Sequence, residues 1–467
     1  MVFSSTSFLY YFLPIVLAVY FLVPFRYKNT ILFFSSLFFY FYGEPVYSIL
    51  MVLSCTSGYL HGIWIEQAKG GRYAKIPLIS SIVFSIGPLI FFKYADFLIV
   101  NANWVLNSNI PLLRIALPIG ISFYTFQIMS YTIDVYRGEA EVQRKLGNFT
   151  MYVSFFPQLI AGPIVRYTTI EREIQNRKHS FENFAYGVRR FVCGLSKKVF
   201  LANTLGELAS LLQNTQAKSI LSYWIVAIAF PLQVYFDFSG YSDMAIGLGR
   251  MFGFRFLENF NYPFISRSIT EFWRRWHISL GTWFRDYVYI PMGGNRVSMA
   301  KWIVNIVVVW FLTGFWHGAE WNFVLWGLYF SLLLVLEKLV LKSLLDRMPG
   351  ILARMLTLFF ILISFVLFNA DGVGESLESF KGMFGLLNIP YSNLHTLYYL
   401  KSYRVILIIS VIAATPLFSK LIGRLKGFKI SGIVISVLEP LVQVLLLLLI
   451  TAYLVDGSFN PFIYFRF

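Results

Sequence analysis

Two histidines in apolar surroundings are the residues of this sequence best suited to proton-transfer chemistry. His317 lies in "FLTGFWHGAEWN" (311–322), between two apolar runs, and His277 lies in "EFWRRWHISLGTWFRDY" (271–287). A neutral imidazole can take the proton of a hydroxyl group while the hydroxyl oxygen attacks a carbonyl carbon. We therefore predict catalytic roles for both histidines. The alternative is that each makes only a structural contact, between helices for His317 and with lipid headgroups for His277.

The residues around His317 could form a pocket for a reacting carbonyl group. Glycines on both sides of the histidine would let a substrate approach closely, and neighbouring tryptophans would supply aromatic walls. Hydrogen-bond donors that point at a developing oxyanion lower the barrier to acyl transfer. The candidates for such donors, or for pocket walls, are Trp316, Asn305 and Asn322.

Arginines near His277 could bind an anionic acyl donor. Stretch 271–287 has helical periodicity, which puts its aromatic side chains on one face and Arg274, His277 and Arg285 on the adjoining face. The planar, permanently charged guanidinium group suits phosphate. We expect one continuous helix in the cytoplasmic membrane interface with donor phosphates bound by Arg274 and Arg285. Anchoring to lipid headgroups would use the same residue types.

Composition identifies the kind of protein that positions these side chains. The chain has 467 residues, of which 57% are hydrophobic and only 13% are charged, whereas soluble domains carry roughly 25% charged residues. Apolar runs long enough to cross a bilayer recur along it, and they are continuous rather than alternating. This indicates an all-α polytopic membrane protein. Basic cytoplasmic loops explain the net charge of +16 better than nucleic-acid binding does. No metal-ligand pattern is present, so no metal site is expected.

The distribution of Lys and Arg predicts the topology. The segments 166–198 and 250–301 each hold eight basic residues against three acidic ones, whereas "NANWVLNSN" (101–109) holds none. The positive-inside rule then places both chain ends outside, with the start of the chain as a spanning helix and not a signal peptide. The candidate spans are 8–25, 30–42, 46–66, 76–99, 115–136, 190–213, 219–236, 303–317, 320–341, 351–369, 403–419 and 432–455.

Two further stretches place helix-breaking residues or charged side chains inside apolar sequence. "FFPQLIAGPIVRY" (155–167) contains two prolines and a glycine, which predicts a re-entrant segment that opens from the cytoplasm. Asp237 and Asp243 interrupt the apolar run 235–254, where a carboxylate is costly unless it is paired. We expect structural Asp–Arg pairs there, with small residues that allow close helix packing.

Long ordered motifs give the chain a family resemblance over nearly its whole length. They are "YFDFSGYSDMAIGLGRMFGF" (235–254), "FWRRWHISLGTWFRDYVYIPMGGNR" (272–296), "FLTGFWHGAEWNFVLWG" (311–327) and "NPFIYFRF" (460–467). With them the chain resembles the membrane-bound O-acyltransferases. Within that family it is similar to the bacterial branch that O-acetylates alginate and peptidoglycan.

The resemblance implies one membrane domain over 1–467, with about 10–12 transmembrane helices in a ring around a thin central zone and with re-entrant and interfacial cytoplasmic helices. It implies that His317 is the essential catalytic base and that His277 is the second histidine of the family. The divisions expected within the domain are N-terminal helices (8–145), a re-entrant and interfacial core (146–300), the helices of the catalytic histidine (301–345) and C-terminal helices (346–467).

The resemblance also implies the reaction and its partners. Acetyl-CoA is the expected donor substrate, with no bound cofactor. The acetyl group would cross the bacterial cytoplasmic membrane for O-acetylation of an exported or cell-surface polysaccharide, with the help of a secreted or membrane-tethered esterase-like partner. Two alternatives stay open. One is transfer of D-alanine from a carrier protein to teichoic acid. The other, from a different class, is a polysaccharide or lipid-linked sugar transporter, which would favour repeated halves that are not visible here.

Overall fold

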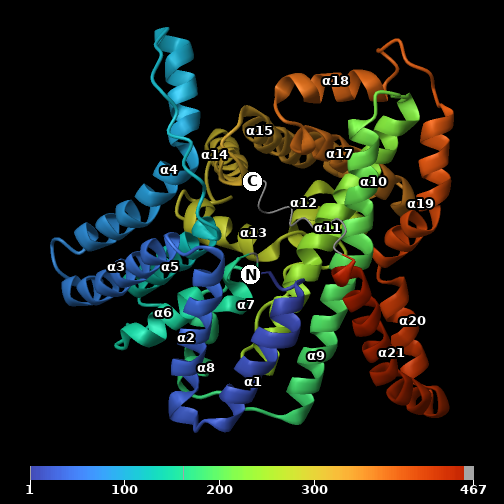
Figure 1. Ribbon diagram of the computed structural model, residues 1–467. Coiled ribbons are helices and arrows are strands. Elements are labelled where there is room, and N and C mark those ends of the chain that lie inside the picture. The colour runs from blue at the N-terminus through green and yellow to red at the C-terminus, as the bar shows by residue number, and fades with distance from the viewer. Residues whose placement is uncertain (1, 161, 457–467) are drawn as a thin grey trace. The chain divides into compact units, whose positions relative to one another are not determined.

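The computed structural model describes residues 2–160 and 162–456, and every regular element in these ranges is a helix (Figure 1). This confirms the predicted all-α class. The C-terminal motif at 460–467 lies outside the described residues. The chain divides into two compact units, one made of residues 1–191 and 242–257, the other of residues 192–241 and 258–467.

The first unit holds the N-terminal helices, and within it α3, α4, α5 and α6 pack on one another. Almost every side chain of α5 is buried. The elements of this unit are a π-helical turn Phe8–Phe12, α1 (Leu13–Leu22), α2 (Phe25–Gly43), α3 (Tyr47–Ala68), α4 (Lys75–Leu106), α5 (Ile121–Arg137), α6 (Leu146–Ser154), α7 (Phe156–Leu159), α8 (Tyr167–Gln175) and most of α9 (Phe181–Ser196).

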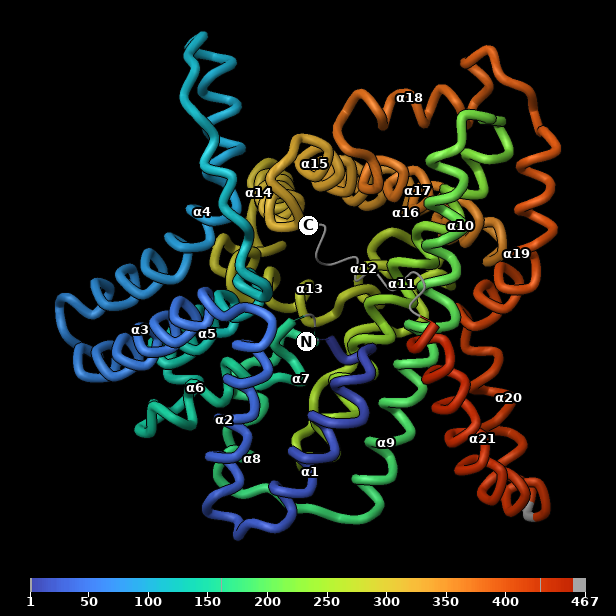
Figure 2. The backbone as a smooth tube through the Cα atoms, in the orientation of Figure 1, coloured from blue at the N-terminus to red at the C-terminus, as the bar shows by residue number. Residues whose placement is uncertain are grey.

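The second unit begins within α9 and ends with a pair of neighbouring C-terminal helices, α20 and α21, whose traces run side by side in Figure 2. Its long helix α11 continues beyond Tyr241 into the first unit. The elements are a π-helical segment Lys197–Ala202, α10 (Asn203–Asn214), α11 (Ile220–Met251), a 3₁₀ turn Pro263–Ile265, α12 (Ile269–Arg275), α13 (Ile278–Phe284), a π-helical segment Arg285–Tyr289, α14 (Met299–His317), α15 (Trp321–Leu336), a π-helical segment Glu337–Leu341, α16 (Lys342–Arg347), α17 (Gly350–Asn369), α18 (Val373–Met383), α19 (Leu394–Ala413), α20 (Leu417–Lys426) and α21 (Lys429–Val455).

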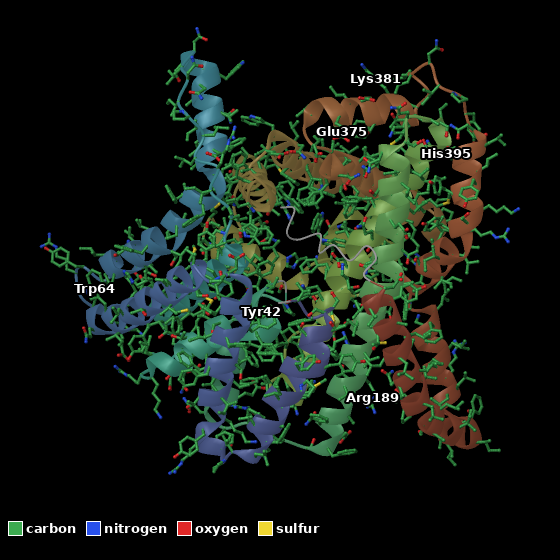
Figure 3. All side chains as sticks on the ribbon, viewed as in Figure 1. Tyr42, Trp64, Arg189, Glu375, Lys381 and His395 are labelled. Carbon is green, nitrogen blue, oxygen red and sulfur yellow. The ribbon has the colours of Figure 1, made fainter. Side chains whose placement is uncertain are left out.

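Eight helices in the described part of the chain are long and apolar enough to cross a membrane. They overlap eight of the twelve predicted spans, although the predicted span 403–419 runs past the end of α19 at Ala413. The other four predicted spans are largely helical but shorter or more polar, so the number of crossings stays a prediction. Large apolar side chains are widely exposed: Tyr42 is 58% exposed and Trp64 is 45% exposed (Figure 3). Such surfaces suit contact with lipid. The helices that reach span length are α3, α4, α11, α14, α15 together with the helical turns that follow it, α17, α19 and α21.

The segment predicted to be re-entrant is broken in the way its sequence suggests. Helix α6 ends at Ser154, the short α7 begins with Pro157 in its first turn, and residues 163–166 form no regular structure. Phe155 and Phe156 are fully buried. Broken backbone at membrane depth requires burial in protein, and this segment has it. The side of the membrane from which it opens stays a prediction.

The predicted continuous helix over 271–287 is wrong. It is broken between α12 and α13 because His277 adopts a left-handed backbone conformation, with φ 44° and ψ 55°. Backbone bonds to an earlier segment replace helical ones at the break: Asn261 N–H donates to the Arg275 carbonyl at 2.9 Å, and Ile278 N–H donates to the Asn259 carbonyl at 2.9 Å. Arg274 and His277 therefore do not share the face of one helix.

The two aspartates of α11 are both paired. Within the first unit, Arg190 NH2 lies 2.7 Å from Asp243 Oδ1, as predicted. Within the second unit, Asp237 Oδ1 lies 2.7 Å from Lys198 Nζ, with both side chains only 4% exposed. The sequence predicts an arginine as the partner of Asp237. The pairing is confirmed, but the partner is a lysine. A buried pair of this kind is costly to break, because removal of one partner leaves the other charge buried and alone.

Candidate active site

His277 is held in place by a single buried amide. The Asn259 side chain is fully buried, and its Oδ1 lies 3.1 Å from the Ser279 backbone N, 2.9 Å from the Ser279 hydroxyl and 3.2 Å from His277 Nδ1. A backbone N–H is always a donor, so the atom of Asn259 that faces it must be the carbonyl oxygen. The same oxygen then accepts a hydrogen bond from His277 Nδ1–H. This fixes the tautomer, with the proton on Nδ1 and the lone pair on Nε2.

The surroundings of His277 keep it neutral. The side chain is 2% exposed, and its Nε2 is buried without a hydrogen-bond partner among the described residues. Burial, and to a smaller extent the nearby His317, lower the pKa of His277 well below its usual value. A neutral ring whose lone pair is directed at no protein group can accept a proton or a hydrogen bond from a substrate.

His317 is the last residue of α14, and its imidazole lies among aromatic rings. Ring centroids lie 5.0 Å away for Trp316, 5.1 Å for Trp326 and 5.3 Å for Phe368, all at steep angles to the imidazole plane. The side chain is half-buried. Three elements, α14, α15 and α17, therefore position it.

Glycines allow α14 and α15 to meet closely at this point. A Cβ atom added to Gly314 would collide with the Phe323 carbonyl oxygen and would lie 3.2 Å from Gly327 Cα, and one added to Gly318 would collide with the Phe323 ring. Any larger residue would push the two backbones apart. The glycines predicted to admit a substrate thus have a structural role as well, because they bring Trp326 of α15 onto His317.

The structure brings His277 and His317 to the same aromatic layer, which is formed by the rings of Trp316, Trp326, Trp273 and Phe368. The ring of Trp316 lies 5.0 Å from that of His317 and 6.2 Å from that of His277. The effect of His317 on the pKa of His277 also places the two within electrostatic reach. Two residues that are remote in the sequence therefore lie near the same tryptophan ring.

The two predicted asparagines hold backbone, Asn305 within α14 and Asn322 at the start of α15. Asn305 Nδ2 donates to the Gly294 carbonyl at 3.0 Å, and Asn322 Nδ2 donates to the Ala370 carbonyl at 2.7 Å. The Oδ1 atoms of both are buried without a partner among the described residues. A carbonyl oxygen cannot stabilise an oxyanion, and both amide groups already serve protein carbonyls. Their assignment as oxyanion donors therefore stays a prediction that the geometry does not favour.

The two predicted donor-binding arginines are exposed. Arg285 Nε lies 2.6 Å from Asp286 Oδ1, so part of its charge is already balanced. Because the helix that was to align Arg274 with Arg285 is broken, their joint role in binding phosphates stays a prediction.

Sequence reasoning missed three residues of the layer. Trp326 and Trp273 have buried indole N–H groups without an acceptor among the described residues, and their ring centroids lie 5.7 Å apart. Both are donors only, as an oxyanion requires. Trp326 lies within a motif that the sequence singled out, at the position where α15 crosses α14. Asn259, which orients His277, lies outside every motif and gave no signal.

The layer contains two histidines and N–H donors, but its described residues form no cluster of metal-ligating side chains. No group of three or more His, Cys, Asp or Glu side chains in the described residues could hold a metal ion. The chemistry that these residues can perform is proton abstraction from a hydroxyl next to a carbonyl whose oxygen meets indole N–H groups.

The chain is similar to known proteins. Residues 140–370 match the model of the membrane-bound O-acyltransferase family. The chain is 42% identical to the "Probable alginate O-acetylase AlgI" of Pseudomonas aeruginosa over 82% of this chain and 75% of that protein. It is 33% identical to the peptidoglycan O-acetyltransferase of Helicobacter pylori over 84% of this chain and 82% of that protein.

A more distant similarity covers less of the chain. The teichoic acid D-alanyltransferase of Bacillus subtilis is 30% identical over 54% of this chain and 68% of that protein. All three relatives transfer an acyl group according to their names, and two of them match over most of this chain. The chain belongs to the membrane-bound O-acyltransferase family.

Proposed function

We propose that this protein transfers acetyl groups from a cytoplasmic donor to a hydroxyl-bearing acceptor on the outer side of a bacterial cytoplasmic membrane, for the O-acetylation of a polysaccharide. The observation that carries the proposal is the aromatic layer in which half-buried His317 and neutral His277 both lie close to the ring of Trp316. The relatives that match over most of the chain act as O-acetylases of alginate and peptidoglycan, according to their names.

The proposed reaction begins at His317. Its imidazole takes the proton of the acceptor hydroxyl as the hydroxyl oxygen forms a bond to the carbonyl carbon of a thioester. The negative charge on the carbonyl oxygen is met by a buried indole N–H, for which Trp326 is the best-placed candidate. The carbon–sulfur bond then breaks, the thiolate leaves and the imidazolium returns its proton to it. The products are an acetyl ester and a free thiol.

His277 acts as a hydrogen-bond acceptor in this proposal. Its Nδ1 proton is bound to Asn259, so Nε2 can receive an N–H or O–H group of donor or acceptor. Acetyl-CoA fits as the donor, because its thioester end is narrow and its charged nucleotide can stay at a basic cytoplasmic surface. A secreted or membrane-tethered esterase-like protein would complete transfer to the polysaccharide.

Transfer of D-alanine from a carrier protein is the second candidate. It rests on the similarity to the teichoic acid D-alanyltransferase, which covers little more than half of the chain. Acetyl transfer is favoured because the acetylating relatives match over more than four fifths of it.

The test uses the purified full chain in proteoliposomes. Acetyl-CoA labelled in its acetyl group is supplied on one side, and mass spectrometry measures acetyl esters on added oligosaccharides. We expect labelled esters with the wild-type protein. His317→Gln should abolish them at unchanged thermal stability, because an amide can hydrogen-bond but cannot take a proton at neutral pH. Near wild-type turnover of His317→Gln would contradict the catalytic assignment, and label only from a D-alanyl carrier would favour the second candidate.

A further inference from the structure

A buried carboxylate in the second unit, that of Glu337, has no part in the reaction proposed above. It follows the last residue of α15 and begins a π-helical segment, within the stretch Trp321–Arg347 that is long and apolar enough to cross a membrane. Its side chain is 8% exposed. A carboxylate is costly in such a stretch and indicates a function there, and π-helical turns are frequent at functional sites.

The carboxylate of Glu337 binds the start of helix α12. Its Oε2 accepts a hydrogen bond from the Ile269 backbone N–H at 2.6 Å, and both of its oxygens lie 3.3 Å from the Thr270 backbone N. The next N–H of the helix, that of Glu271, donates to the Ser268 hydroxyl oxygen at 3.1 Å. The first N–H groups of a helix have no partner within it. Side chains therefore supply these partners in α12, and Glu337 ties the helix to the end of α15.

Helix α12 depends on such bonds for its position. It has seven residues, and a helix this short is not stable in isolation. Its other end is tied as well, because Asn261 N–H donates to the Arg275 carbonyl at 2.9 Å and Arg275 Nη1 donates to the Asn261 carbonyl at 3.1 Å. The place of α12 is therefore set by bonds to other parts of the chain.

The short helix carries part of the aromatic layer. The ring centroid of Trp273 lies 4.5 Å from that of Trp310, 4.8 Å from that of Phe330 and 5.7 Å from that of Trp326. The helix ends at Arg275, two residues before His277. The position of α12 against α15 thus sets the distance between the buried N–H groups of Trp273 and Trp326, and it also sets where the chain enters the turn at His277.

We propose that Glu337 is a positioning residue for acyl transfer. Its carboxylate joins α15, which holds Trp326 against His317, to α12, which holds Trp273 and leads into His277. Without this link α12 can move relative to α15, and a displacement of 1 Å at reacting groups can cost about 10²-fold in rate. The inference rests on the proposed function for the reaction, but the link itself does not depend on it.

The first measurement is acetyl transfer by Glu337→Gln in proteoliposomes, per folded molecule. An amide has one acceptor oxygen and a donor group in place of the second oxygen, so the Thr270 N–H loses its partner. We expect kcat to fall about tenfold, less than for a full displacement because one bond remains. The KM for acetyl-CoA should stay nearly unchanged, since positioning acts on the transition state and not on donor binding.

The second measurement follows the position of Trp273 by fluorine NMR of protein labelled with 5-fluorotryptophan. The chain has 11 tryptophans, and Trp273→Phe and Trp104→Phe identify the two resonances that matter. Glu337→Gln should shift or broaden the Trp273 resonance. The resonance of Trp104, which lies on α4 in the first unit and is 84% exposed, should not change.

Glu337→Asp is a second variant that keeps the charge and shortens the side chain by one methylene group. It can keep its bonds only if α12 moves towards α15. We therefore expect a shifted Trp273 resonance and a lowered kcat in this variant too. Full activity with an unmoved resonance in Glu337→Asp would mean that the charge alone matters, and it would overturn the positioning role.

The control is Asp243→Asn, which removes another buried carboxylate, 6% exposed and paired with Arg190 in the first unit. It should lower the thermal stability, and it should leave kcat per folded molecule and the Trp273 resonance unchanged. An equal fall of kcat in Asp243→Asn would show that loss of stability explains the effect. Unchanged kcat or an unmoved Trp273 resonance in Glu337→Gln would also overturn the proposal.

The two measurements separate this inference from the proposed function. A wild-type protein without acetyl transfer, in which Glu337→Gln still moves the Trp273 resonance, would remove the proposed reaction and leave the link between the helices standing. Acetyl transfer by the wild type, with no effect of Glu337→Gln on either quantity, would remove the inference alone.

Discussion

Two histidines in turns next to helices, His179 in the first unit and His277 in the second, differ in what their ring nitrogens meet. Both have lowered pKa values: burial, Lys28 and Arg177 lower the pKa of His179, and burial and His317 lower that of His277. His179 Nε2, however, lies 2.8 Å from the Tyr20 hydroxyl, whereas His277 Nε2 has no partner in the described chain. A lowered pKa accompanies both kinds of site, so hydrogen-bond saturation is what distinguishes them.

The group around Tyr20 shows what a saturated site looks like. The Tyr20 hydroxyl donates to the Phe252 carbonyl at 2.7 Å and accepts from Arg177 Nε at 2.8 Å, so His179 must be a donor to the same oxygen. Arg177 also donates to Asn29 Oδ1 at 2.6 Å. These bonds join α1, α2 and the segment after α8. The lone pair that catalysis would need is absent from the Nε2 of His179, and present on that of His277.

Removal of each imidazole ring in turn tests whether His277 and His179 differ in function. His277→Ala should reduce acetyl transfer per folded molecule by about tenfold, because it removes the acceptor atom Nε2 and with it about 1.4 kcal/mol of hydrogen bonding. His179→Ala should lower the thermal stability and leave turnover per folded molecule unchanged. Labelled acetyl transfer and thermal unfolding of the two purified variants measure both quantities. A His277→Ala protein that is unstable yet active would make the two histidines alike.

Removal of the Tyr20 hydroxyl, which three groups share, should lower the free energy of unfolding. Tyr20→Phe leaves His179, Arg177 and the Phe252 carbonyl each short of one partner, which should cost about 1–3 kcal/mol of unfolding free energy. Tyr40→Phe is a control, because it removes a buried hydroxyl that donates to a single carbonyl, that of Ile119. It should cost less. Chemical denaturation of both variants gives the difference, and an equal loss would mean that the Tyr20 network adds nothing to stability.

At His277, replacement of the orienting Asn259 amide should change the pH dependence of the reaction rate. Folded His277 stays neutral below about pH 6.5, where an unfolded histidine takes up a proton, so its contribution to stability is lost as the pH falls below that value. Asn259→Asp puts a negative charge beside Nδ1–H, which raises the pKa of His277. The acid limb of the rate profile should move to higher pH, while the rate on the plateau changes less. An unmoved acid limb in a folded Asn259→Asp protein would mean that Asn259 does not act through His277.

The smallest effect is expected at the exposed arginines. Replacement of Arg274 and Arg285 by Gln should raise the KM for acetyl-CoA a few-fold with little change in kcat, if they bind donor phosphates. Arg189→Gln, on α9, is a matched control at another residue of the predicted basic face. Donor kinetics that are unchanged in the double variant would leave the two arginines with headgroups or with Asp286 as their partners.

The sequence allowed the helical class and eight of the twelve predicted spans to be predicted correctly, because these depend on local composition. The catalytic roles of His277 and His317 stay predictions. The sequence could not reveal the break at His277. The periodicity of 271–287 suits a helix, and only bonds to Asn259 and Asn261, which are remote in the sequence, favour a different backbone. Local patterns are overridden where such tertiary bonds exist.

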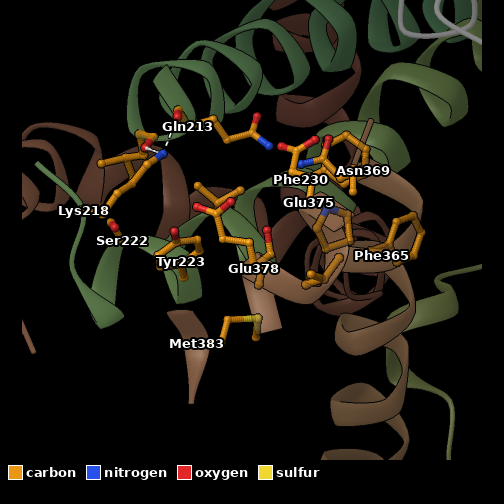
Figure 4. A pocket seen from close by; sticks show the side chains of 17 residues that line it. Gln213, Lys218, Ser222, Tyr223, Phe230, Phe365, Asn369, Glu375, Glu378 and Met383 are labelled. Carbon is orange, nitrogen blue, oxygen red and sulfur yellow. Dashed lines mark hydrogen bonds between the residues drawn. The ribbon is translucent and has the colours of Figure 1, made fainter. Parts of the chain in front are cut away.

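The partners of buried groups were also beyond sequence reasoning. Lysine and arginine are equally able to pair with Asp237, and the choice of Lys198 follows from helix packing. The same holds for the cavity between α10, α11, α17 and α18 (Figure 4), whose lining residues come from separate stretches of the chain. Glu375 and Glu378 lie three positions apart on one helix face, but what they face is set by α11 and α17.

The left-handed backbone at His277 sets a limit on how stable this protein can become. Such a conformation costs a residue with a side chain roughly 1–2 kcal/mol relative to glycine. Glycine at this position would relieve that cost but would discard the imidazole, its hydrogen bond to Asn259 and its packing on Phe238. Thermostable variants must therefore gain their stability elsewhere if they are to keep working.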